Sequence, residues 1–175
     1  TGASVGKYLG ASQMMKGGLG IAAFAAGNVK CAAIVAVNCL GDVRDTESGK
    51  ILAGVLNEGK NKICSTGELM LRDIASEKDV FGGNTTLGCI LTNAGLTKSQ
   101  CNKLASVTHN AYARAILPVH TSADGDTIFA MSFGNEEAAP DALGVLAVLA
   151  MERAIADAVR SAQPAYGIPA ACSLE

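Results

Sequence analysis

The sequence predicts an α+β fold in which helices pack on β-sheets. Residues 17–56 contain short apolar runs separated by turn signals, and residues 86–93 form an apolar run with β-branched members. Two later segments have apolar residues at helical spacing behind clear start signals. Because strand-type and helix-type segments follow one another, we expect layers of helices and sheets around one core.

Length and composition indicate one globular domain with an unusual core. The chain has 175 residues, of which 49% are hydrophobic and 17% charged, and this composition excludes a disordered chain. Aromatic residues make up only 4%, Trp is absent, and there are 20 Gly. We therefore expect a core of Ala, Val, Leu and Ile in which backbones approach one another closely.

Charge and apolar run length argue against two classes of partner. The 14 Lys and Arg are balanced by 16 Asp and Glu, so the chain offers no basic surface to nucleic acid or to an anionic membrane. The longest apolar run, residues 142–151, is too short to span a bilayer.

The six Cys include no CxxC pair, which makes zinc a poor expectation. Cys31, Cys39 and Cys89 lie in apolar runs, as is typical of buried thiols in a reducing cytoplasm.

The first half of the chain is predicted to be mainly β. Short apolar runs alternate there with turn signals such as Gly27-Asn28 and the polar segment 45–49. Residues 57–80 are polar, mixed in charge and weakly periodic, so we expect a connector with one helical turn near residues 68–74. The strands predicted up to the middle of the chain are residues 19–24, 29–40, 51–56 and 86–93.

The second half is predicted to hold two helices with a strand, residues 127–133, between them. Thr97 and Gln100 have the spacing of a capping box, and the helix that they open ends before Pro118. Pro140 opens the second helix at a first-turn position. This helix is apolar on all sides at first, and its second half directs charged residues outward. Those residues are Glu152, Arg153, Asp157 and Arg160.

Two polar positions in the first half have both a functional and a structural interpretation. Residues 2–7 look like a phosphate loop, but the glycine spacing is one residue short and Tyr8 replaces the Ser or Thr that would hold magnesium. On these residues alone, Lys7 is interpreted as a solvated surface lysine. Asn38 is an amide inside an apolar strand, where it either makes a structural hydrogen bond or donates to a developing oxyanion.

Residues 82–86, Gly-Gly-Asn-Thr-Thr, precede a predicted buried strand. Two glycines let the backbone bend, and a hydroxyl at this position can attack the carbonyl of the residue before it. Such an N-to-O acyl shift would break the bond between Asn84 and Thr85 and free the α-amine of Thr85, which would serve as a base beside its own hydroxyl. The alternative is a plain turn before a strand.

The acidic pair Asp124-Gly125-Asp126 also precedes a predicted strand. Asp-Gly is a common turn pair, and the further acidic ligands of a calcium loop are missing. An ordinary acidic turn is one interpretation, and two carboxylates that orient a lysine or an α-amine are the other. His109 and His120 are interpreted as packing or capping residues outside the candidate site.

Seven short motifs occur in order between Gly2 and about Arg160. They are Gly-Ala-Ser-Val-Gly-Lys (2–7), Lys-Gly-Gly-Leu-Gly (16–20), Val-Ala-Val-Asn-Cys-Leu-Gly-Asp-Val (35–43), Gly-Asn-Thr-Thr-Leu (83–87), Thr-Asn-Ala (92–94), Ala-Arg-Ala-Ile-x-Pro-x-His-Thr (113–121) and Asp-Gly-Asp-Thr-x-Phe-Ala (124–130). Any one motif is weakly specific. In this order they resemble the L-aminopeptidase/D-esterase family, which includes β-peptidyl aminopeptidases and nylon-oligomer hydrolases.

The resemblance implies a four-layer αββα sandwich like that of N-terminal-nucleophile hydrolases, with different connectivity. It also implies a precursor that cuts itself once, between Asn84 and Thr85, as in the nylon-oligomer branch. Residues 1–84 would then end the first subunit and residues 85–173 would form the second, within a single domain that lacks an upstream segment of the family. Residues 174–175 resemble a cloning scar.

The same resemblance implies roles for five residues. Thr85 corresponds to the nucleophile, Lys7 to the active-site lysine, and Asn38 to the oxyanion donor, while Asp124 and Asp126 correspond to the acidic pair near the nucleophile. No metal or cofactor is implied. We therefore expect a cytoplasmic peptidase or amidase that acts on a small peptide or amide with a free amine, as a homo-oligomer of processed subunits.

Two alternatives stay open. The first is an acyltransferase resembling the ornithine acetyltransferases, which also expose a threonine by self-cleavage and use an amino-acid acceptor in place of water. The second is a non-catalytic structural subunit in which the bond between Asn84 and Thr85 stays intact. The Ala-rich helix predicted over residues 140–160 could serve subunit packing in each case.

Overall fold

The computed structural model of the chain describes residues 2–76 and 83–174. Thr1, Glu175 and Gly82, the first glycine before the predicted cleavage point, lie outside the described residues. The helices are α1 (Thr66–Arg72), α2 (Lys98–Ala115) and α3 (Pro140–Arg160). The strands are β1 (Ser4–Val5), β2 (Met15–Lys16), β3 (Gly18–Ala26), β4 (Val29–Val37), β5 (Asp42–Arg44), β6 (Ile51–Ala53), β7 (Leu87–Ala94), β8 (Ile116–Leu117) and β9 (Thr127–Glu136).

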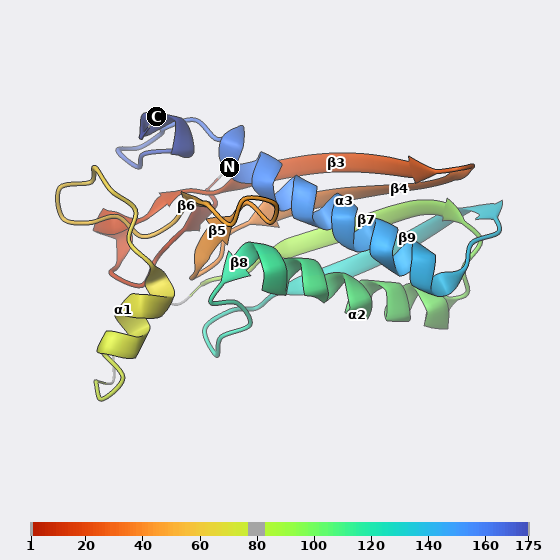
Figure 1. Cartoon of the computed structure of the whole chain (residues 1–175), viewed down its shortest axis with the longest axis horizontal. Helices are drawn as coiled ribbons and strands as arrows, with labels where there is room; N and C mark the ends of the chain where they lie inside the picture. Colours follow the sequence, from red (N-terminus) through yellow and green to blue (C-terminus); the bar gives the residue numbers. More distant parts are fainter. Residues whose placement is uncertain (1, 77–82, 175) are drawn as a thin grey trace.

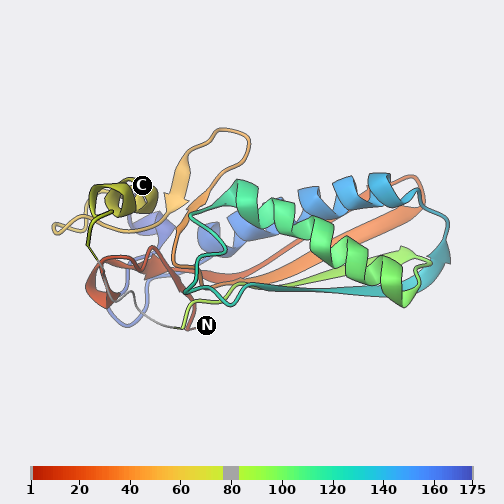
Figure 2. The ribbon, with the colours of Figure 1, turned by 90° about the horizontal axis from the view of Figure 1, so that it is seen from below.

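A four-stranded sheet in the order β3-β4-β7-β9 forms the frame of the molecule. The first two neighbouring pairs are antiparallel, whereas β7 and β9 are parallel. Two smaller sheets, β1-β2 and β6-β5-β8, lie at one end of the large sheet (Figure 1). Helices α2 and α3 lie side by side on one face of the large sheet, as Figure 2 shows. The predicted α+β class is confirmed.

The two faces of the large sheet differ in burial. Along β4, Ala33, Val35 and Val37 are fully buried beneath the helices, whereas Ile34 points to the other face and is 37% exposed. The strand register places Ile34 in a row with Ile21 and Cys89 on the neighbouring strands. This second face keeps large apolar side chains exposed, so the described residues build one helix layer and one sheet layer of the expected sandwich. The exposed apolar residues of this face are Leu19, Ile21, Ile34, Leu87, Phe129, Met131 and Phe133.

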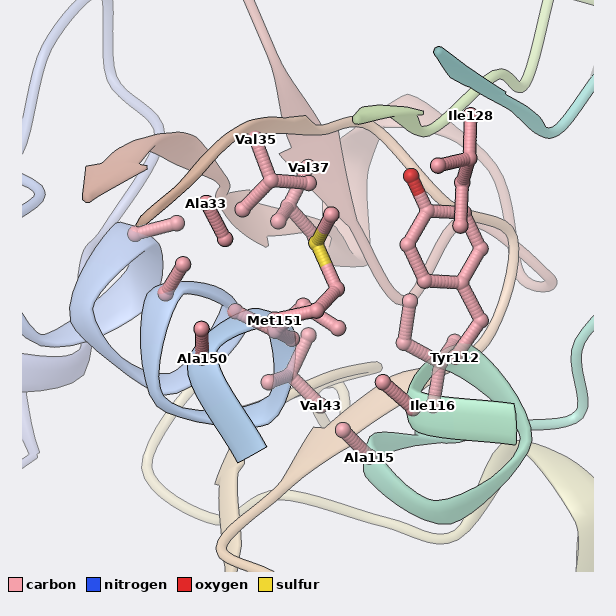
Figure 3. Close-up of a cluster of buried hydrophobic side chains, with 14 of the residues drawn as sticks. Ala33, Val35, Val37, Val43, Tyr112, Ala115, Ile116, Ile128, Ala150 and Met151 are labelled. Carbon is pink, nitrogen blue, oxygen red and sulfur yellow. The ribbon is translucent and has the colours of Figure 1, made fainter. Parts of the chain in front are cut away.

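Small residues let the backbones of α3 and β3 approach each other closely where the helix crosses the strand. A Cβ atom added at Gly20 would overlap the backbone carbonyl of Ala154, and one added at Gly18 would overlap that of Ala158. The helix backbone therefore rests directly on the strand backbone. Further along, larger side chains fill the core, and Figure 3 shows Val35, Tyr112 and Met151 meeting there from β4, α2 and α3.

Local sequence signals predicted the helix ends well. Thr97 and Gln100 form both hydrogen bonds of the capping box, as predicted. Pro140 stands in the first turn of α3, also as predicted. The connector contains a longer helix than the single turn expected, because the Ser65 side chain accepts a hydrogen bond from Glu68 N–H and caps α1.

The prediction that Glu152 points outward is wrong. Its side chain is only 6% exposed, and it lies 3.0 Å from the guanidinium of Arg114 on α2. Thr46 Oγ1 in the loop after β5 also donates to Glu152, at 3.1 Å. The neighbouring Arg153 and Arg160 are exposed and pair with Glu47 and Asp45, so this face of α3 anchors a loop.

All six cysteines are free thiols. Cys31 and Cys39 are buried as expected, but Cys89 is only partly buried because it lies on the uncovered face of the sheet. None of the helices in the described ranges combines the length and the apolar character that crossing a membrane requires.

Candidate active site

All of the predicted site residues meet at one end of the large sheet. Because β4 is antiparallel to β7, the end of β4 lies beside the start of β7. Because β7 and β9 are parallel, the segments that enter these two strands also lie side by side, and a bridge between Asn84 and Asp124 extends their pairing. Lys7 joins them from the segment after β1, since its backbone N–H donates to Leu40 O at 3.0 Å.

Asn38 connects three parts of the site. Its Oδ1 accepts hydrogen bonds from Ser4 N–H at 3.1 Å and from Lys7 Nζ at 3.0 Å. Its backbone oxygen accepts from Lys7 Nζ at 3.1 Å and from Thr85 N–H at 2.9 Å. Its Nδ2 donates to Gly83 O at 2.9 Å. One carbonyl oxygen thus brings together the lysine and the nitrogen that cleavage would turn into an α-amine.

Lys7 is buried, being 1% exposed, which contradicts its interpretation as a solvated surface lysine. Burial lowers the pKa of its ammonium group, because an apolar environment disfavours the charged form, while the charges of Cys39 and Asp124 partly oppose the shift. A lysine of this kind gives up its proton more readily than one in water, and the neutral amine is then a base.

Two donors converge on the carbonyl oxygen of Asn84. Thr85 Oγ1 lies 2.5 Å from this oxygen and Gly125 N–H donates to it at 2.9 Å. A side chain at position 125 would displace the hydroxyl, since a Cβ there would lie 2.9 Å from Thr85 Oγ1. Sequence reasoning treated Gly125 only as a turn residue, although a glycine between two predicted site residues is a signal of close backbone approach.

The two aspartates hold the backbone around Thr85. Asp124 accepts hydrogen bonds from Leu40 N–H at 3.2 Å and from the Thr121 hydroxyl at 2.7 Å. Asp126 Oδ1 accepts from Thr86 N–H at 2.9 Å. The Asp126 carboxylate therefore fixes the residue after the candidate nucleophile, and the Asp124 carboxylate ties its own loop to the segment after β4. Both are more structural tasks than the orienting of an amine that their spacing suggested.

Two histidines and a tyrosine lie next to this pair. His120 Nδ1 lies 2.9 Å from Asp126 Oδ2, and the ring centroids of His120 and His109 are 5.0 Å apart. The Tyr112 hydroxyl is 3.4 Å from Thr86 O. Sequence reasoning placed both histidines outside the site, because nothing in their local sequence shows that the loop after Pro118 folds back onto α2.

The described residues contain no group of three or more His, Cys, Asp or Glu side chains that could hold a metal ion. The groups that meet at this end of the sheet include the Thr85 hydroxyl, the buried Lys7 amine, the Asn38 amide and backbone N–H groups. These are the parts that attack on a carbonyl requires: a nucleophile, a base and donors for the oxyanion.

Comparison with known proteins finds relatives of this chain among peptidases and amide hydrolases. Curated relatives include an uncharacterised aminopeptidase of Mycobacterium leprae, 31% identical over 99% of this chain and 51% of its own length. A 6-aminohexanoate-oligomer endohydrolase of Kocuria is 30% identical over 61% of this chain and 30% of its own length. The chain spans about half the length of the aminopeptidase relatives that it matches.

Solved structures show the same fold. The L-aminopeptidase D-Ala-esterase/amidase of Ochrobactrum anthropi, described as a variant of the Ntn hydrolase fold, matches 90% of this chain and 42% of its own with a TM-score of 0.56 at 19% identity. A Pyrococcus horikoshii protein matches 89% of this chain and 42% of its own, with a TM-score of 0.54 at 22% identity. The family described as Peptidase family S58 matches residues 1–171. The chain therefore belongs to peptidase family S58.

Proposed function

We propose that this chain is part of a self-processing peptidase or amidase whose nucleophile is Thr85, freed by cleavage of the bond between Asn84 and Thr85. One observation carries the proposal: the Thr85 hydroxyl and the Gly125 N–H both lie against the carbonyl oxygen of Asn84. A hydroxyl next to its own preceding carbonyl, with a fixed donor on the oxygen where charge develops, is the arrangement that an N-to-O acyl shift needs.

The cleavage proceeds in two steps. Thr85 Oγ attacks the carbonyl carbon of Asn84, its proton passes to the departing amide nitrogen, and an ester replaces the peptide bond. Water then hydrolyses the ester, leaving a carboxylate on Asn84, a hydroxyl on Thr85 and a free α-amine. Gly125 N–H stabilises the oxyanion of the first step.

Turnover uses the same groups on an external amide. The freed α-amine of Thr85, or the neutral amine of Lys7 on the same Asn38 oxygen, accepts the proton of the attacking hydroxyl. In the uncut chain Asn38 Nδ2 is occupied by Gly83 O. Departure of the Gly83-Asn84 end leaves this donor free for the oxyanion of a substrate, so the uncut segment occupies the place that a substrate would take.

The two products of cleavage stay together because the sheet joins them. β4 lies before the cut and β7 after it, and the pair is hydrogen-bonded from Cys31 opposite Thr92 to Ala36 opposite Leu87. Residues up to 84 and residues from 85 would then be two subunits of one domain. Its substrates would be small peptides or amides with a free amine, consistent with the names of the aminopeptidase and oligomer-hydrolase relatives.

Assembly into a homo-oligomer is part of the same proposal. An apolar groove runs between α2 and α3, and Val145 and Leu149 in its lining are 61% and 45% exposed. Polar side chains of both signs, Lys103 and Asp141, lie in the same lining, so two copies could pair them. Light scattering should report more than one copy, and fewer copies for Val145→Glu. An unchanged mass would remove this surface from the assembly.

Intact mass of the denatured protein tests the main proposal. We expect a fragment that begins at Thr85 in the wild type and in Thr85→Ser, which keeps a hydroxyl, and an uncut chain in Thr85→Ala. Cleavage in Thr85→Ala would exclude Thr85. An uncut wild type that still assembles would favour a structural subunit, and acyl transfer to an added amino acid in preference to water would favour an acyltransferase.

A further inference from the structure

We propose that His120 is a positioning residue for self-cleavage: it holds the Asp126 carboxylate, which fixes the residue that follows the nucleophile. The inference rests on the proposed function and adds a residue to it. Asp126 is 2% exposed in its side chain and uses its two oxygens on different partners. Oδ1 accepts from Thr86 N–H at 2.9 Å, and Oδ2 faces His120 Nδ1 at 2.9 Å.

The backbone of His120 adopts a conformation that serves this contact. Its φ is +55°, in the left-handed region that residues with a side chain enter rarely. In this conformation the backbone N–H of His120 also points to Asp126 Oδ2, at 3.4 Å. The imidazole Nδ1 and the backbone N–H of one residue therefore both face one carboxylate oxygen. A disfavoured backbone geometry persists where the surroundings over-determine it, and here the surroundings are the carboxylate itself.

Thr86 is held on its other side by α2. The Tyr112 hydroxyl lies 3.4 Å from Thr86 O, and Thr127 N–H donates to the same oxygen at 3.0 Å. The backbone N–H and C=O of Thr86 are thus both engaged, the first through Asp126. Because Thr85 Oγ1 must stay against Asn84 O, a shift of Thr86 would move the attacking hydroxyl, and small errors of placement at a reacting atom cost a large part of the rate.

Groups from every neighbouring element face the imidazole. His109 and Tyr112 approach it from α2, with ring centroids 5.0 Å and 6.1 Å away, and Asp126 approaches from its own loop. Burial lowers the pKa of His109, and the charge of His120 lowers it further. The charge of Asp126 acts in the opposite direction and raises the pKa of His109, so the carboxylate influences both imidazoles, and it lies 2.9 Å from His120 Nδ1.

Two variants of equal size, His120→Asn and His120→Asp, test whether an N–H donor at position 120 matters independently of side-chain shape. His120→Asn keeps an N–H donor near the position of Nδ1, and asparagine tolerates a positive φ. His120→Asp has the same size and a similar tolerance, but it presents an acceptor and a negative charge to Asp126. We expect self-cleavage to slow by about tenfold or more in His120→Asp and to stay within about threefold of the wild type in His120→Asn.

The readout is the first-order rate at which the fragment beginning at Thr85 appears, sampled by mass during cell-free synthesis of the chain. His109→Asn, which replaces the neighbouring imidazole on α2 and leaves the contact of His120 with Asp126 in place, is the control and should cleave at the wild-type rate. After maturation, the His120→Asp enzyme should have a lower kcat than the wild type and an unchanged KM. Near-UV circular dichroism shows whether each variant folds, and His120→Gly, which fits φ +55° without any side chain, should be as slow as His120→Asp.

Equal rates in the Asn and Asp variants would overturn the inference, as would wild-type cleavage in His120→Gly. A wild-type chain that is never cut at Thr85, or a Thr85→Ala chain that is cut, would overturn the proposed function together with the inference. Cleavage that depends on Thr85 but is indifferent to position 120 would overturn the inference alone.

Discussion

The amide N–H of Gly125 donates to the carbonyl oxygen of Asn84 at 2.9 Å. This hydrogen bond joins the loop before β9 to the residue before β7, and it ends on the oxygen that becomes negatively charged when Thr85 attacks. The donor is backbone, so it is already oriented before the reaction and needs no rearrangement during it. It is also a donor that no side-chain motif in the sequence announces.

Substitution of Gly125 by alanine should slow self-cleavage by about 100-fold, the usual effect of disturbing an oxyanion donor. The added Cβ would lie 2.9 Å from Thr85 Oγ1 and displace the hydroxyl from the Asn84 carbonyl. Gly2→Ala is the matched control, because a Cβ there meets nothing within 4 Å. A time course of fragment masses measures both variants, and equal rates would remove Gly125 from the oxyanion site.

Replacement of Asn38 by aspartate should leave the fold stable and lower turnover by about 100-fold. The aspartate keeps the acceptor that Ser4 N–H and Lys7 Nζ use, but it has no donor to replace Nδ2. Steady-state kinetics with a model amide and thermal unfolding separate the two effects. Unchanged kcat/KM in a folded variant would show that Nδ2 has no part in turnover.

Lys7 should make both activity and stability depend on pH. Burial lowers the pKa of its ammonium group from the ordinary value of 10.5, so between the lowered value and 10.5 the folded state binds fewer protons than the unfolded state. Stability should therefore rise with pH through this window, and turnover should rise as the amine becomes neutral. Lys7→Met removes the charge and should abolish both slopes, measured by urea unfolding and by pH–rate profiles. A Lys7→Met enzyme with the wild-type profile would contradict the assignment.

Thr86→Val should be neutral or stabilising by up to about 1 kcal/mol. Thr86 is fully buried, and its Oγ1 has no hydrogen-bond partner within the described ranges of the chain. Valine keeps the shape and removes the unsatisfied hydroxyl. Urea unfolding of the wild type and the variant is the measurement. A loss of more than about 1 kcal/mol would mean that the hydroxyl has a partner in the folded protein.

Features coded by neighbouring residues could be predicted from the sequence. The capping box of Thr97 and Gln100 and the Pro140 start of α3 depend on residues a few positions apart, and both were correct. The hairpin at Gly27-Asn28 was found for the same reason, although β4 ends at Val37 and not at Leu40.

Features made by distant segments could not be predicted in this way. Glu152 follows a solvent-facing pattern along α3, yet Arg114 and Thr46 reach it from elsewhere and bury it. The residues around Lys7 in the sequence predict a surface lysine, and only the resemblance to a family indicated that it belongs to the site. In the structure its side chain is 1% exposed. The position of Gly125 between two predicted site residues signals a close backbone approach, but which carbonyl its N–H meets depends on how the loops fold back, and so does the contact of His120 with Asp126.

The pairing of β4 with β7 has a consequence for how the processed protein would denature. The uncut chain unfolds as one molecule, so its midpoint is independent of concentration. After the cut, the hydrogen-bonded ladder from Cys31–Thr92 to Ala36–Leu87 joins two separate chains, and unfolding releases two molecules. Dilution then favours the unfolded state, and refolding must begin with a bimolecular encounter. The precursor would thus fold as a single chain, whereas the processed protein could refold only if its two subunits associate.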